Sequence, residues 1–158
     1  MGIRKAHLLT QKAVKPNNMD KQKVKLAYNV VSWPVRNALV YYSESRPELF
    51  PQSEVQATVE FIDSCRLFFD ILNVNHVKKG PISSLENKKV LDLGVVSNYF
   101  ENIFHSGILT RETHMALQQT ISASIEIIKL LLSRGPKRKV FTARFQQDPL
   151  EEHFGKHR

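Results

Sequence analysis

The chain has 158 residues, of which 42% are hydrophobic and 24% are charged, and its net charge at pH 7 is +8. This length fits one domain, or one domain with a fragment of a second, and supplies enough apolar residues for a buried core. A single cysteine, Cys65, excludes an internal disulfide and a cysteine-based zinc site. Since no signal peptide and no apolar run of roughly 18 residues are found, we expect a nuclear or cytoplasmic protein without membrane contact.

The positive charge is concentrated near the two ends of the sequence. Residues 1–25 hold seven lysines and arginines against one aspartate, Asp20, and SRGPKRK at 133–139 adds four basic residues. Such clusters indicate partners that carry phosphate, either a nucleotide or a nucleic acid. The alternative is that the two clusters are a solvated basic tail and a solvated basic loop. Lys23 and Lys25 stand at the start of a predicted helix, where an anion is also favoured.

From Lys21 to Tyr42, apolar residues recur at helical spacing, which predicts a long amphipathic helix. Pro34 interrupts this pattern and cannot donate a helical hydrogen bond. We therefore expect either a kink near residues 30–33 or two consecutive helices.

A second helix is predicted to start at Ser53, with Gln56 completing a capping box, and to run to about Val74. Its apolar residues cover a wide arc, so we expect this helix to lie at the centre of the fold. Cys65 lies on that arc and is interpreted as a small hydrophobic residue. Residues 75–89 contain the sequence KKGP and are predicted to form a loop.

Two more helices are predicted in the remaining body of the chain. The segment VVSNYFENIFHSG at 95–107 predicts a short helix closed by Gly107. Thr110 is the predicted cap of the next helix, which ends at Gly135.

The last segment differs in character. Residues 139–145, KVFTARF, alternate as a strand does, and Asp148 with Glu151 form a capping box that predicts a final helix. The predicted fold class is therefore mainly α, with residues 1–138 as a helical domain and residues 139–158 as a strand-helix piece of a second one.

Three residues at the end of the second helix, Phe69, Asp70 and Asn73, can project from one side of a helical turn. An aromatic ring for stacking beside a carboxylate and an amide suits a purine, and a carboxylate that accepts two N–H groups selects guanine over adenine. The alternative is a core phenylalanine beside solvated polar residues. No P-loop and no G-x-G-x-x-G motif occurs, so lysines are the candidate phosphate ligands.

Three segments, KQKVKLAYNVVS, FIDSCRLFFDILN and QQDPLEEHFGKHR, together resemble the P-element-type transposases, including relatives with a THAP zinc-binding domain. The last segment is the most specific, because it is similar to the family pattern Q-D-x-x-E-x-x-F-G-x-x-R. In that family a helical GTP-binding domain is inserted into an RNase H-like catalytic domain. The resemblance implies that residues 1–138 are the insertion domain and that residues 139–158 return to the catalytic domain.

The resemblance also implies roles for single residues. Glu151 corresponds to the third metal-binding catalytic carboxylate, and Asp148 to the acidic residue associated with GTP and its magnesium ion. The implied nucleotide-binding positions are Lys23, Val24, Phe69, Asp70 and Asn73, with Lys5 as a further lysine. The implied cofactors are GTP and Mg²⁺, and the implied partner is transposon-end DNA.

The two earlier catalytic aspartates of such transposases are absent from this sequence. We therefore expect a fragment or derivative that binds GTP-Mg as an assembly cofactor for transposition and cannot cut DNA alone. Two alternatives are a domesticated helical interaction module with a decayed nucleotide site, and a transposase subunit whose partners supply the missing carboxylates. Self-association is left open.

Overall fold

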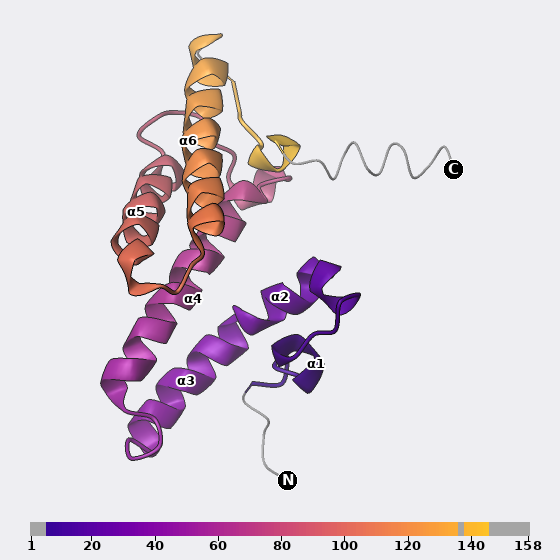
Figure 1. Cartoon of the computed structure of the whole chain (residues 1–158). Coiled ribbons are helices and arrows are strands. Elements are labelled where there is room, and N and C mark those ends of the chain that lie inside the picture. Colours follow the sequence, from indigo (N-terminus) through magenta and orange to yellow (C-terminus); the bar gives the residue numbers. More distant parts are fainter. Residues whose placement is uncertain (1–5, 136–137, 146–158) are drawn as a thin grey trace. The chain divides into compact units, whose positions relative to one another are not determined.

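The computed structural model describes residues 6–135 and 138–145, and its helices confirm the mainly α fold class (Figure 1). The chain divides into two compact units, Met1–Arg66 and Leu67–Arg158. Helix α4, Gln52–Leu72, begins in the first unit and ends in the second.

From residue 6 onward, the first unit contains three helices before α4. They are α1 (Gln11–Val14), α2 (Val24–Val30) and α3 (Trp33–Ser45), with a 3₁₀ turn at Asp20–Gln22. Pro34 lies in the first turn of α3, where its missing N–H would have no helical acceptor. Ser32 precedes α3, and its hydroxyl donates to the Asn29 carbonyl at 2.7 Å. Of the two expected outcomes, the structure therefore has two consecutive helices.

Polar contacts join α3 to α4 beside the apolar core of the first unit. Arg36 and Asp63 form an ion pair with an Nε–Oδ1 distance of 3.2 Å. Arg66 is buried, and its guanidinium carbon lies 4.5 Å from the ring centroid of Tyr28 and 5.5 Å from that of Trp33. The planar cation is thus covered by aromatic faces, which suits arginine better than lysine.

The second unit contains the end of α4, helices α5 (Lys88–Asn102) and α6 (Arg111–Ser133), and short 3₁₀ turns at Val77–Lys79, Phe104–Ser106 and Thr142–Phe145. Helices α5 and α6 pack side by side as an antiparallel pair (Figure 1). Their buried residues include Leu93 and Phe100 on α5 and Ile121 and Ile128 on α6.

Two predicted helix starts are wrong. Helix α4 already begins at Gln52, so Ser53 lies inside it and is not its N-cap. The Pro51 carbonyl accepts from the Glu54 and Val55 amides, and the Gln56 side chain donates to Glu60. Helix α5 begins at Lys88, before the predicted start at 95, because the side chain of Asn87 accepts from the Lys89 amide and caps it.

The predicted caps of α6 are confirmed. The Thr110 hydroxyl accepts from the Thr113 amide at 3.2 Å, and α6 ends at Ser133, just before Gly135. By length and composition alone α6 could cross a membrane, a test that core helices of soluble proteins also pass.

The strand predicted over 139–145 is also wrong. Val140 forms one antiparallel bridge with Ile82, and the chain then turns into the 3₁₀ helix Thr142–Phe145. The alternating pattern arises because Val140 and Thr142 are both buried; among the described residues, only Ile82 pairs with the segment as a strand would. The predicted boundary at 138/139 remains a prediction, and the helix expected after Asp148 lies outside the described residues.

The fully buried Thr142 anchors this returning segment to the end of α4. Its hydroxyl donates to the Ile71 carbonyl and accepts from the Val74 amide at 3.4 Å, while the Ala143 amide donates to the Val74 carbonyl at 3.2 Å. The last turn of α4 would otherwise have unpaired backbone groups. These bonds therefore fix the position at which α4 ends.

Candidate functional site

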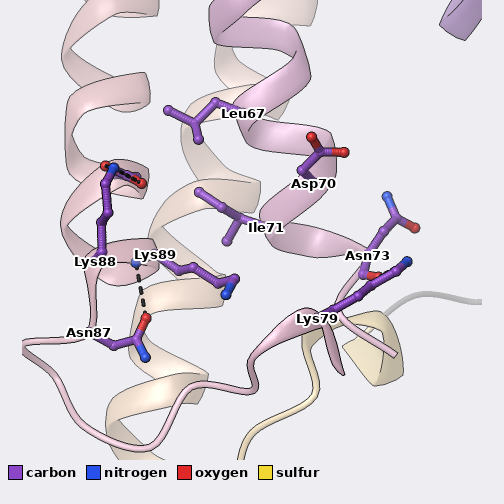
Figure 2. Close-up of a pocket in the computed structure, with 9 residues that line it drawn as sticks. Leu67, Asp70, Ile71, Asn73, Lys79, Asn87, Lys88 and Lys89 are labelled. Atoms are coloured by element: carbon purple, nitrogen blue, oxygen red, sulfur yellow. Dashed lines mark hydrogen bonds and ion pairs between the residues drawn. The ribbon is translucent and has the colours of Figure 1, made fainter. Parts of the chain in front are cut away.

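A cavity of about 450 Å³ lies in the second unit, between the last turn of α4 and the start of α5 (Figure 2). It is lined by Leu67, Asp70, Ile71, Asn73, Lys79, Asn87, Lys88, Lys89 and Asp92. Its volume is in the range of about 300–1,000 Å³ that is typical of small-molecule sites. Its wall combines an aliphatic surface from α4 with carboxylate, amide and ammonium groups.

Two of the residues singled out in the sequence, Asp70 and Asn73, meet in this cavity (Figure 2). Asp70 is solvent-exposed, and Asn73 lies at the end of α4, where its side-chain amide donates to the Phe69 carbonyl at 2.7 Å. Phe69 itself is half-buried and is not among the residues that line the cavity. The cavity therefore holds the expected hydrogen-bonding pair without the expected aromatic ring.

Three lysines that sequence reasoning missed as site residues also line the cavity: Lys79, Lys88 and Lys89. Lys79 donates from Nζ to the Asn73 carbonyl at 3.0 Å, and Lys88 forms an ion pair with Asp92 at 2.8 Å. The only signal in the sequence was the basic composition of the predicted loop at 75–89 and its continuation into α5.

Gly80 is in direct contact with the side chain of Lys89. Lys89 Nζ donates to the Gly80 carbonyl at 2.7 Å, and a Cβ at position 80 would lie 3.1 Å from that nitrogen. The φ angle of Gly80 is +67°, which is strained for any residue with a Cβ. The positive φ therefore favours glycine here, and a Cβ would also displace the Lys89 ammonium by a few tenths of an ångström.

The first unit places Lys23 and Val24 on another cavity, of about 530 Å³, whose other lining residues are Lys12, Lys25, Leu26 and Asn29. Asp20 is only 3% exposed and pairs with two of these lysines, with Nζ–Oδ1 distances of 2.9 Å to Lys23 and 3.2 Å to Lys12. The hydrogen bond from Lys23 above all, and that from Lys12, lower the pKa of the Asp20 carboxyl.

This lowered pKa makes a prediction for acid stability. A carboxyl with a depressed folded-state pKa stabilises the fold above its unfolded value, ordinarily 3.8, and the stabilisation is lost as pH falls through the folded value. Asp20→Asn should therefore lower the unfolding free energy measured in urea at pH 7, and the difference from the parent should shrink well below pH 3.8. A loss of equal size at both pH values would contradict this assignment. Glu126→Gln, which alters an exposed pair with Lys129, is the control.

Other candidate groups are less informative. Burial raises the pKa of the Cys65 thiol to about 11, so the thiol stays protonated at neutral pH, as expected for a small hydrophobic residue.

Within residues 6–135 and 138–145, no three metal-ligating side chains come together. The expected metal ligands Asp148 and Glu151, like Lys5, lie outside the described residues.

The family model described as "TNP-like, GTP-binding insertion domain" matches residues 2–84, which is more than half of the chain. The matched range contains Lys23, Val24, Asp70 and Asn73, and it ends before α5. No curated protein and no solved structure matches the chain.

Proposed function

Because this chain belongs to the family of TNP-like GTP-binding insertion domains, we propose that it binds GTP in the cavity between α4 and α5. The observation that carries the proposal is that Asp70 and Asn73 line one cavity of suitable volume. Guanine presents two neighbouring N–H groups on one edge, which a carboxylate accepts together, whereas adenine presents an acceptor at the same position. Asp70 would read this edge, and the amide of Asn73 would support it.

Calorimetric titration with GTP and ATP tests this proposal. The parent protein should bind GTP at least tenfold more tightly than ATP, and Asp70→Ala should lose the preference, because a hydrogen bond to a charged group is worth about 1.5–3 kcal/mol. Glu60→Ala is the matched control, because it removes an exposed carboxylate from the same helix. Equal affinity for the two nucleotides, or a preference that survives in Asp70→Ala, would contradict the proposal.

The finer parts of the proposal are supported by the resemblance to P-element and THAP-type transposases. We propose a transposase-derived protein in which GTP with magnesium serves as a cofactor for assembly on transposon-end DNA. In this view residues 139–158 belong to an RNase H-like domain, Glu151 is its catalytic carboxylate, and Asp148 and Lys5 contribute to the nucleotide site. The chain alone would not cut DNA, and it would act in the nucleus or cytoplasm.

A second candidate function, a helical interaction module, is favoured by apolar side chains on the outside of α5. Leu91 and Val95 are one helical turn apart and are 60% and 61% exposed. A contiguous exposed apolar patch marks a protein-binding surface, and these two residues would form part of one. A well-folded protein that binds neither GTP nor ATP in the titration would favour this function.

A further inference from the structure

We propose that Lys79, Lys88 and Lys89 form a lysine wall that binds the phosphate groups of the nucleotide. This inference rests on the proposed function, since it assigns one more part of the same site. The sequence had pointed to Lys23 and Lys25 as phosphate ligands; both line the other cavity, in the first unit, where Asp20 pairs with Lys23 and Lys12.

The charge of the lysine wall is only partly compensated. Lys88 pairs with Asp92, whereas in the part of the chain that the structure describes, Lys79 and Lys89 form no ion pair with a carboxylate. Their ammonium groups are bonded to neutral carbonyls, which orient a cation without cancelling its charge. Two positive charges on one cavity wall favour a ligand that carries several negative charges, as a nucleoside triphosphate does.

The lysine wall is also ordered before any ligand binds. The carbonyl of Asn73 holds Lys79 at 3.0 Å, and the carbonyl of Gly80 holds Lys89 at 2.7 Å. An ammonium group has three donors, so each lysine keeps two for a ligand after making this bond. Because long side chains otherwise lose freedom on binding, prior ordering should increase the affinity for phosphate.

The lysine wall is connected to the residues that would read the base. Lys79 is bonded to the backbone of Asn73, and Figure 2 shows its side chain lying close beside Asn73 at one edge of the cavity. Lys89 extends from the first turn of α5 to beneath Ile71 (Figure 2), and its ammonium bonds the carbonyl of Gly80, which follows Lys79 in the chain. A nucleotide whose base lies at Asp70 and Asn73 could therefore extend its phosphates along the lysines.

Titration of the whole chain with guanosine, GMP, GDP, GTP and inorganic triphosphate tests this inference. Affinity should rise with the number of phosphates on the nucleoside, and the gain should shrink between 50 and 200 mM salt. Lys79→Met and Lys89→Met should each lower the affinity for GTP about tenfold, as expected for a lost charge-assisted hydrogen bond. Neither substitution should change the affinity for guanosine. Lys129→Met, which removes an exposed lysine from α6, should change neither affinity.

The possible results separate this inference from the proposed function. If guanosine and GTP bind equally, or if the Met variants weaken guanosine as much as GTP, the lysine wall is not a phosphate site although the guanine site stands. Binding of inorganic triphosphate without guanosine, lost in Lys79→Met and Lys89→Met, would support the lysine wall and overturn the guanine site. If no probe binds to protein that is folded by circular dichroism, both are overturned.

Discussion

Asp70→Asn should change the nucleotide preference of the cavity from GTP to xanthosine triphosphate. Xanthine carries a carbonyl where guanine carries the exocyclic amino group, so the ligand offers an acceptor to the new amide N–H. The same substitution removes the acceptor for the amino group of guanine. Each mismatch leaves a polar group unpaired. We therefore expect the affinity for GTP to fall by roughly 100-fold and the affinity for xanthosine triphosphate to rise by a similar factor.

The measurement is calorimetry of both nucleotides with both proteins. Asp92→Asn is the matched control, because it makes the same chemical change on α5 in the lining of the same cavity. This control should not acquire a preference for xanthosine triphosphate. If Asp70→Asn weakens GTP without any gain for xanthosine triphosphate, Asp70 does not read the base.

Thr142→Val should lower the unfolding free energy by about 2–4 kcal/mol. Valine has nearly the same shape, but the Ile71 carbonyl and the Val74 amide would lose their partner in a fully buried position. Each buried group left unsatisfied costs about 1–3 kcal/mol. Because these groups end α4 next to Asn73, GTP affinity should fall as well.

Urea unfolding of the parent, Thr142→Val and Thr142→Ser measures this effect. Serine keeps the hydroxyl and loses one methyl group, so it should cost less, on the order of 1 kcal/mol. If valine costs no more than serine, the hydroxyl does not anchor the returning segment.

Several elements could be predicted from the sequence because their signals are local. The apolar spacing and Pro34 together define the break between α2 and α3, and Thr110 marks the start of α6. The grouping of Asp70 and Asn73 on one cavity likewise follows from their spacing on one helix. In each case the physical cause lies within a few residues of the position that it determines.

The remaining features depend on contacts between distant residues. The segment at 139–145 looked like a strand, but its conformation is set by Thr142, which bonds the end of α4 some seventy residues earlier in the chain. Lys89 lines the cavity with its ammonium bonded to the carbonyl of Gly80, nine residues earlier, whose backbone has a positive φ. Periodicity and capping patterns contain no information on either contact.

The most direct test of the account is a map of backbone amide chemical shifts in nitrogen-labelled protein titrated with GTP, with ATP as the control. Among the residues that line the cavity, we expect the largest GTP-specific changes at Asp70, Asn73, Lys79 and Lys89. If saturating GTP leaves the amides of residues 70–89 unchanged, the cavity is not the nucleotide site.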